Sequence, residues 1–487
     1  MTATDSPESA LSVRNLNPKV VEAQYAVRGE IVIRAGQIEK ELKQGKQFPF
    51  DKVVYCNIGN PQSLGQQPIS FFRQVLALCD YPELIKPAKA NKLFPADVIR
   101  RAEEYLAEIP GGTGAYSDSR GADICRQHVA LGIERRDGYP AEKDQIFLTD
   151  GASQGVHSVM RMLLRDESDA ILTPIPQYPL YSATITLYGG TLLPYYLNED
   201  QGWGLDVKHL DAQTQKARSE GKTVRALVVI NPGNPTGAIL TKQNLEEVVR
   251  FCKAQKIVLL ADEVYQDNIY AEGKEFHSFK KVVREMGGEA EGVQLFSMHS
   301  ISKGYYGECG RRGGYLEIIN VADDVVGQLY KLASINLCSN VNGQICTALM
   351  MNPPQEGDES YPEYAKERQA LLDSLKRRAK MLTDSLNQLE GVKCQESEGA
   401  LYAMPRITLP AGAVEAAKEK GKAPDFLYCM ELLEATGIAT VPGSGFKQVE
   451  GTYHFRTTCL PPESDLQKVV QRLTAFHKDF INKYGGL

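Results

Sequence analysis

The segment Ser300-Ile301-Ser302-Lys303-Gly304-Tyr305-Tyr306-Gly307 decides the fold that we expect for this sequence of 487 residues. It places one lysine between hydroxyl side chains and glycines. Two other polar segments lie upstream of it, Asn231-Pro232-Gly233-Asn234-Pro235-Thr236-Gly237 and Ala261-Asp262-Glu263-Val264-Tyr265. Together the three segments supply an amine, a carboxylate, a phenol and a carboxamide.

These four groups are the ones that an enzyme needs around pyridoxal phosphate. Lys303 would bond covalently to the aldehyde carbon of the cofactor, and Asp262 would keep its pyridine nitrogen protonated, so that the ring accepts electrons. Tyr265 and Asn234 would donate hydrogen bonds to the ring oxygen and favour its ionised form. We therefore predict Lys303, Asp262 and Tyr265 as catalytic residues.

Each segment taken alone has a commoner interpretation. A lysine in a glycine-rich loop is usually a solvated charge, and Asn-Pro-x-Asn-Pro-Thr-Gly is by itself a turn. Asp262 alone would be a polar residue that closes the buried strand expected at residues 257–260. The joint occurrence of the segments in this order favours the cofactor site.

The joint pattern resembles the fold-type I, or class I/II, aminotransferases over nearly the whole chain, and it is closest to their alanine aminotransferase branch. The segments that carry the closer match are Asn17-Pro18-Lys19, Tyr25-Ala26-Val27-Arg28-Gly29-Glu30, Gly65-Gln66-Gln67-Pro68, Pro174-Ile175-Pro176-Gln177-Tyr178-Pro179-Leu180-Tyr181 and Val441-Pro442-Gly443-Ser444-Gly445-Phe446. The resemblance implies an α/β fold. Its large domain would have a mostly parallel seven-stranded sheet flanked by helices, and a smaller α/β domain would pack beside it.

A site for the cofactor's phosphate is expected where a strand at 145–149 meets a helix that opens with Gly151-Ala152-Ser153-Gln154-Gly155. A glycine turn at a helix N-terminus offers free N–H groups to an anion, although most such turns are ordinary capped loops. We expect contacts from Ala152, Ser153 and Gln154. The resemblance adds Ser300, Ser302 and an arginine, which is Arg311 in most of the family and Arg312 in the alanine branch. We expect Arg312.

Two tyrosines take roles from the same resemblance. Tyr178 corresponds to the aromatic residue that stacks on the pyridine ring. Tyr116 corresponds to the tyrosine that each subunit lends to the phosphate site of its partner. The chain is therefore expected to form a homodimer.

The substrate's α-carboxylate requires a guanidinium that binds it with two parallel hydrogen bonds. Arg456, in Tyr453-His454-Phe455-Arg456-Thr457-Thr458, corresponds to that arginine, although an arginine in such a strand is otherwise a common surface ion pair. Asn234 and Gly59 are expected beside the substrate. Arg28 is the residue that we expect at the distal carboxylate of a dicarboxylic substrate.

Composition excludes several classes of partner and site. A net charge of −6 argues against nucleic acid, and no apolar run approaches the ~18 residues of a membrane span. The seven histidines are scattered and the ten cysteines form no C-x-x-C pair, so no metal site is expected. Residues 1–16 show neither a signal core nor a basic transit pattern, which favours a cytoplasmic location.

The domain organisation follows from the apolar pattern. Short apolar runs between residues 146 and 319 alternate with helical patterns, as in a parallel sheet with crossover helices. A long amphipathic helix is expected from about residue 361, after the break at Met351-Asn352-Pro353-Pro354. We predict an N-terminal arm and part of the small domain at 1–85, the large domain at 86–350 and the rest of the small domain at 351–487.

The predicted reaction is the transfer of an amino group from L-alanine to 2-oxoglutarate, which yields pyruvate and L-glutamate. The nearest alternative is a glutamate:glyoxylate aminotransferase with the same catalytic residues. A lyase similar to 1-aminocyclopropane-1-carboxylate synthase and a non-catalytic regulator that binds pyridoxal phosphate are further alternatives.

Overall fold

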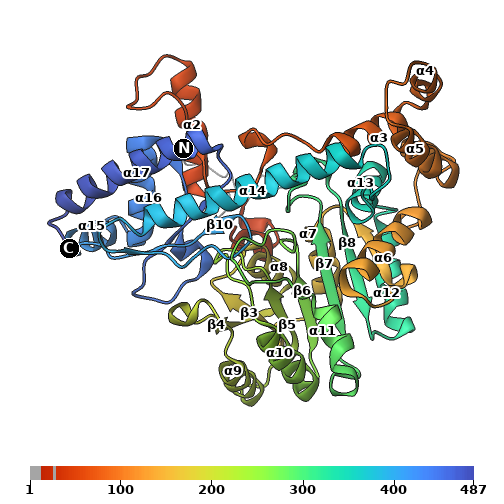
Figure 1. The fold of residues 1–487 in the computed structure, drawn as a ribbon. Coiled ribbons are helices and arrows are strands. Elements are labelled where there is room, and N and C mark those ends of the chain that lie inside the picture. Colours follow the sequence, from red (N-terminus) through yellow and green to blue (C-terminus); the bar gives the residue numbers. More distant parts are fainter. Residues whose placement is uncertain (1–12, 26–28) are drawn as a thin grey trace.

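The computed structural model describes residues 13–25 and 29–487, and its central element is a seven-stranded sheet (Figure 1). The strands are β2 (Ile146–Thr149), β3 (Asp169–Ile175), β4 (Thr191–Tyr196), β5 (Thr223–Ile230), β6 (Val258–Asp262), β7 (Leu295–Ser300) and β8 (Gly314–Ile319). Their order is β2-β8-β7-β6-β5-β3-β4. All neighbours pair in parallel except at β8, which is antiparallel to β2 and β7. The predicted mostly parallel sheet is confirmed.

Helices cover both faces of this sheet because the central strands are apolar on both sides. In β5 the side chains alternate, so that Leu227 and Val229 enter one core cluster while Ala226, Val228 and Ile230 enter another. The helices of the first face are α9 (Val207–Ser219), α10 (Lys242–Gln255) and α11 (Phe279–Met286), and those of the second are α7 (Ala152–Leu163), α8 (Leu180–Tyr188) and α12 (Asp323–Ile335).

A further core cluster lies at the β2 and β8 edge of the sheet. Its helices are α3 (Ser70–Asp80), α4 (Ile85–Asn91), α5 (Ala96–Glu108), α6 (Asp123–Asp137) and α13 (Val341–Met351). Because α3 packs here with α5 and α13, the segment before residue 85 contributes to the core beside the sheet.

The remaining elements form a second body from the two ends of the chain (Figure 1). They are α2 (Glu30–Lys43), β1 (Val54–Tyr55), α14 (Tyr361–Leu386), β9 (Val392–Lys393), β10 (Tyr402–Ala403), β11 (Arg406–Ile407), α15 (Ala411–Glu419), α16 (Pro424–Thr436), β12 (Ile438–Ala439), β13 (Val441–Pro442), β14 (Phe455–Thr458) and α17 (Glu463–Lys483). The short helix α1 (Pro18–Glu22) instead packs against α8 of the large sheet. β1 pairs in parallel with β12, so that an early and a late segment close one small sheet. The domain limits at residues 85 and 350 stay a prediction.

Helix α14 joins the two bodies. Leu371 and Leu372 pack against the core beside the large sheet, whereas Leu375, Leu382 and Leu386 belong to the core of the second body. The long amphipathic helix that we expected from about residue 361 is present. In the described part of the chain, no helix is both long and apolar enough to cross a membrane.

Gly132 in α6 provides a test of the packing beside the sheet. A Cβ atom there would lie 2.3 Å from the carbonyl oxygen of Met351, a backbone atom that can move only if α13 shifts. We expect Gly132→Ala to lower the free energy of unfolding by about 1–3 kcal/mol, the usual cost of overpacking.

Gly36 in α2 is the matched control. Its added Cβ would meet no atom within 4 Å, so Gly36→Ala should raise the free energy of unfolding by about 0.5–1 kcal/mol through helix propensity alone. Urea unfolding of both variants measures the two effects, and a Gly132→Ala protein as stable as the parent would contradict the predicted clash.

Candidate active site

A cavity of about 540 Å³ opens at the carboxyl ends of the central strands. Ile230, Asp262 and Ser300, the last residues of β5, β6 and β7, lie in its wall, as expected for a ligand site of an open α/β sheet. The rest of the wall comes from the predicted loops and from both ends of the chain: Tyr25, Ile58, Gly59, Asn60, Ala152, Ser153, Tyr178, Leu180, Asn234, Val264, Tyr265, Ser302, Lys303, Cys309, Gly310, Arg312, Tyr402 and Arg456.

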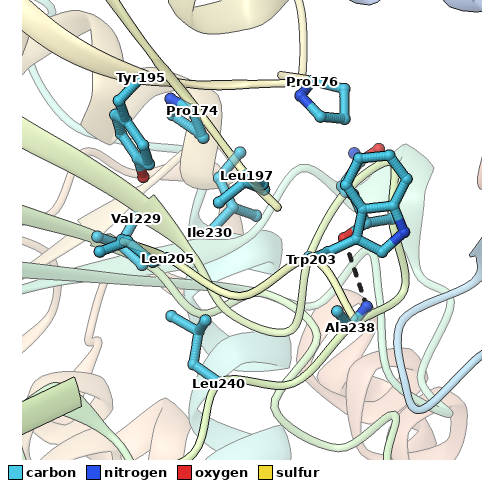
Figure 2. A pocket seen from close by; sticks show the side chains of 13 residues that line it. Pro174, Pro176, Tyr195, Leu197, Trp203, Leu205, Val229, Ile230, Ala238 and Leu240 are labelled. Atoms are coloured by element: carbon cyan, nitrogen blue, oxygen red, sulfur yellow. Dashed lines mark hydrogen bonds between the residues drawn. The ribbon is translucent and has the colours of Figure 1, made fainter. Parts of the chain in front are cut away.

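A much smaller cavity of about 20 Å³ lies behind this wall and shares Ile230 and Asn234 with it (Figure 2). Its other walls are mostly apolar and include Trp203, Leu205 and Leu240. A volume of this size holds about one water molecule. The space that fits a cofactor and a substrate is therefore the larger cavity.

Lys303 and Asp262 enter the larger cavity from the ends of adjacent strands. The Lys303 ammonium donates a hydrogen bond to the carbonyl oxygen of Gly59 at 3.0 Å. Asp262 is 4% exposed and accepts a hydrogen bond from the Tyr181 hydroxyl at 2.7 Å. Burial raises the pKa of the Asp262 carboxyl, although the Tyr181 hydrogen bond and the charge of Lys303 act in the opposite direction.

One oxygen of Asp262 has no strong donor. Among the described residues, its one hydrogen bond is a 3.5 Å contact from the N–H of Val264. A buried carboxylate oxygen in this state favours a cationic or N–H partner from the cavity side. Such a partner fits a protonated ring nitrogen.

Arg312 marks an anion site at the other end of the cavity. Its guanidinium donates to the carbonyl oxygen of Asp150 at 3.0 Å and to the hydroxyls of Ser153 at 3.3 Å and Ser302 at 3.4 Å. Within the described residues, no carboxylate lies within ion-pair distance of Arg312, whereas Arg311 contacts Glu308 at 3.4 Å. The unneutralised charge beside the N-terminus of α7 fits a phosphate.

Gly151 keeps this anion site compact. Its φ of +78° lies in the left-handed region, and an added Cβ would lie 2.3 Å from a guanidinium nitrogen of Arg312. A residue with a side chain would therefore be strained and would displace the arginine.

Arg456 is the second cation of the cavity and is only 1% exposed. Its guanidinium donates to the side-chain oxygen of Asn234 at 3.0 Å and to the carbonyl oxygen of Asn57, and it lies 4.1 Å from the ring centre of Tyr402. Its Nε atom is buried without a hydrogen-bond partner, and no described carboxylate forms an ion pair with it. A buried cation in this state favours an anionic ligand.

Two predicted residues are not in the cavity wall, and a third falls outside the described residues. The side chain of Gln154 accepts a hydrogen bond from the N–H of Asp150 at 2.5 Å and does not line the cavity. Tyr116 is 77% exposed and is also absent from the cavity wall. Arg28 lies outside the described residues. The roles of all three stay predictions.

Three tyrosines at the site were not assigned roles from the sequence. Tyr181 holds Asp262, Tyr25 shares a 2.8 Å hydrogen bond with Tyr178, and the hydroxyl of Tyr402 accepts one from the N–H of Gly59 at 2.9 Å. Tyr25 and Tyr181 lie inside segments that carry the family resemblance. Tyr402 gives no local signal beyond that of a buried strand aromatic.

The comparison with family models identifies the chain. The model for aminotransferase class I and II matches residues 87–473. The chain belongs to this family. Enzymes of the family depend on pyridoxal phosphate, and the unpaired cations, the buried carboxylate and the lysine of the cavity fit that cofactor.

The similar relatives cover nearly the whole chain. "Alanine aminotransferase 2" of Panicum miliaceum is 56% identical over 98% of this chain and 99% of its own length. "Alanine aminotransferase 2, mitochondrial" of Arabidopsis thaliana is 55% identical over 99% of this chain and 90% of its own. "Glutamate–glyoxylate aminotransferase 1" of the same plant is 52% identical over 98% of this chain and 97% of its own.

The fold also matches solved structures. "Alanine aminotransferase from Pyrococcus furiosus" superposes with a TM-score of 0.74 at 24% identity, over 95% of this chain and 98% of that chain. At this level of identity the likeness shows the fold alone, which is the predicted fold of an aminotransferase.

Tyr181 tests the contact that holds Asp262. We expect Tyr181→Phe to raise the pKa of the Asp262 carboxyl further, because the hydrogen bond lowers it. Loss of a hydrogen bond to a charged group costs about 1.5–3 kcal/mol, so cofactor affinity should fall roughly ten- to a hundred-fold. Fluorescence titration of the apoprotein with pyridoxal phosphate measures this affinity.

Tyr195→Phe is the control for this titration, because the buried Tyr195 hydroxyl donates at 2.8 Å to the carbonyl of Val228 and lies outside the larger cavity. An unchanged affinity in Tyr181→Phe would show that the hydroxyl does not support the carboxylate.

Proposed function

We propose that this aminotransferase transfers the amino group of L-alanine to 2-oxoglutarate and releases pyruvate and L-glutamate. The proposal rests mainly on Arg456, which lies in the same cavity as Lys303 and Asp262. This arginine is buried, forms no ion pair with a described carboxylate, and has an Nε atom without a hydrogen-bond partner. An α-amino acid carries a carboxylate for the guanidinium and an amine for the chemistry beside the lysine. Two relatives that are at least 55% identical over nearly the whole chain are named alanine aminotransferases, which supports alanine as the donor.

Each cavity residue takes one part in the proposed reaction. When bound, pyridoxal phosphate supplies an aldehyde for the amino group and a protonated ring that withdraws electrons from the substrate's α-carbon. Lys303 would hold the cofactor covalently, and its amine would also move the proton at the substrate's α-carbon. Asp262 keeps the ring nitrogen protonated, and Tyr265 and Asn234 donate to the ring oxygen.

The remaining residues bind and orient the substrate and the cofactor. Arg456, whose guanidinium is hydrogen-bonded to Asn234, binds the α-carboxylate through its planar guanidinium. The backbone of Gly59 lies in the same cavity wall. Arg312, Ser300, Ser302 and the α7 residues Ala152 and Ser153 would hold the phosphate, and Tyr178 would lie against the ring. The residue for the distal carboxylate of 2-oxoglutarate stays the predicted Arg28.

A glutamate:glyoxylate aminotransferase is the second candidate, because a relative with that name is 52% identical over 98% of this chain. The cavity residues described above serve both reactions equally. The relatives named above do not favour the lyase or the non-catalytic regulator.

We further propose a homodimer that acts on small amino acids and 2-oxo acids in the cytoplasm, without nucleic acid or membrane partners. The exposed Tyr116 supports the dimer, since a tyrosine that is 77% exposed in one chain is free to reach a neighbouring subunit. The proposed location rests on the sequence, and three similar relatives are named as mitochondrial.

Single-turnover half-reactions test the substrate assignment. The loaded enzyme is mixed with alanine, glutamate or S-adenosylmethionine, and the aminated enzyme with pyruvate, 2-oxoglutarate or glyoxylate, while the cofactor spectrum is followed. We expect alanine, glutamate, pyruvate and 2-oxoglutarate to react within the catalytic turnover time. Lys303→Ala should lose both the covalent attachment and turnover, because no other amine lines the described cavity.

Other outcomes assign the other activities. Rapid reaction with glyoxylate but not with alanine or pyruvate would replace the proposal by the glyoxylate enzyme. Consumption of S-adenosylmethionine would favour the lyase, and absence of every half-reaction would favour the regulator.

Complementation tests the dimer. Lys303→Ala and Tyr116→Ala subunits, each with little activity, are mixed under conditions in which subunits exchange. A heterodimer contains one site with both residues intact, so we expect activity well above that of either parent. If exchange is verified and activity stays at the parental level, Tyr116 does not act across a subunit interface.

A further inference from the structure

Tyr402 lies among the reacting groups of the cavity, and the proposed reaction gives it no part. It is 3% exposed in β10, and its hydroxyl oxygen accepts a hydrogen bond from the N–H of Gly59 at 2.9 Å. The carbonyl oxygen of the same Gly59 accepts a hydrogen bond from the Lys303 ammonium at 3.0 Å. One residue is thus held by Tyr402 and Lys303 together.

The absence of a side chain at Gly59 leaves a small space that both the Tyr402 phenol and the Lys303 ammonium border. A Cβ atom at Gly59 would lie 2.6 Å from the hydroxyl oxygen of Tyr402 and 3.1 Å from Nζ of Lys303. Both groups therefore border the space that a side chain would fill.

The groups that face Tyr402 favour a negative charge on its oxygen. Lys303 reaches it from the loop after β7 and Arg456 from β14, with the guanidinium 4.1 Å from the ring centre. Tyr265, which follows β6, makes a side-chain hydrogen bond to Tyr402, and their ring centres lie 6.1 Å apart. Tyr178, before α8, also interacts with it electrostatically and is uncharged at neutral pH because burial raises its pKa.

The proton affinity of Tyr402 reflects these neighbours. Burial raises the pKa of its hydroxyl, but the charges of Lys303 and Arg456 together with the hydrogen bonds from the Tyr265 hydroxyl and the Gly59 N–H outweigh that effect, so that the pKa is lowered. Among the described tyrosines with a shifted pKa, Tyr402 is the one whose pKa falls, whereas burial raises that of Tyr265 well above its ordinary value.

We propose that Tyr402 is a positioning residue that acts through Lys303, and that its oxygen receives the proton that the lysine must lose before its nitrogen bonds to the aldehyde carbon of the cofactor. This inference rests on the proposed role of Lys303 as the anchor. The nitrogen needs a free electron pair for that bond, so an acceptor inside the cavity is required.

The transfer balances without another reactant. When the Tyr402 hydroxyl is ionised, an N–H bond of the Lys303 ammonium breaks and an O–H bond forms on the phenolate oxygen. The products are a neutral amine with a free electron pair and a neutral phenol. In a buried site this neutral pair is desolvated at less cost than the ion pair, which favours the transfer when the cavity closes over the cofactor.

Titration of the apoprotein by tyrosinate absorbance tests the acceptor directly. We expect the wild type to show one tyrosine that ionises below the ordinary pKa of about 10. Tyr402→Phe should lack this signal, and Lys303→Met should move it to higher pH because the ammonium is gone. Tyr428→Phe is the control, since the buried Tyr428 hydroxyl bonds His477 at 3.0 Å outside the cavity and should leave the signal unchanged.

Cofactor attachment tests the transfer. The rate at which borohydride traps pyridoxal phosphate on the apoprotein should fall about a hundred-fold in Tyr402→Phe near neutral pH, the usual worth of a general base. The loss should shrink as the pH approaches about 10.4, where free lysine deprotonates unaided. A merely structural defect would instead slow attachment equally at every pH, and that result would overturn the proposal.

Two further results would also overturn it: no tyrosine of lowered pKa in the wild type, or one that Lys303→Met leaves unmoved. Both remain measurable if Tyr402→Phe fails to fold. Failure of the proposed anchor role would be seen in a separate result. Lys303→Met would then still trap the cofactor at normal stoichiometry. The tyrosine titration does not depend on whether the cofactor is trapped.

Discussion

The buried guanidinium of Arg456 is the charge on which the arrangement of the cavity depends. At 1% exposure the guanidinium is desolvated. Within the described chain it contacts an amide oxygen, a carbonyl oxygen and two aromatic faces, but no carboxylate. Its desolvation is offset in full only when an anion enters. A bound carboxylate therefore stabilises the site, and the binding free energy of the substrate includes the compensation of this desolvation cost.

The same constraint explains why the two ends of the chain meet at the sheet. Arg456 in β14 is brought over the large sheet by the small three-stranded sheet, and the Gly59 loop follows β1, which is paired with β12. Each segment supplies only part of the cavity wall. Lys303 and Asp262 are set by the large sheet, and the substrate clamp by the second body, so the active site exists only where the two bodies meet.

The sequence predicts the parts of this site that depend on local pattern. Asp262 and Lys303 each follow a short apolar run, and the ends of parallel strands gather at one edge, so their proximity follows from the strand pattern. The structure adds contacts that no local pattern contains. Tyr181 meets Asp262 across 81 residues and Tyr402 meets Gly59 across 343, and such pairs depend on how the two bodies pack. The side chain of Gln154 hydrogen-bonds the backbone N–H of Asp150 in its own loop. Capping residues bind nearby free N–H groups for the same reason.

Helix α14 couples the unfolding of the two bodies. Its 26 residues form a rod of roughly 39 Å that packs on the core beside the large sheet near its start and on the core of the second body over the rest. If one body melted, the helix would lose part of its apolar support and would expose the other core to water. Cooperativity then extends over the whole chain: heat or denaturant should produce one transition instead of two, and a partly melted enzyme with an intact cofactor site should not accumulate.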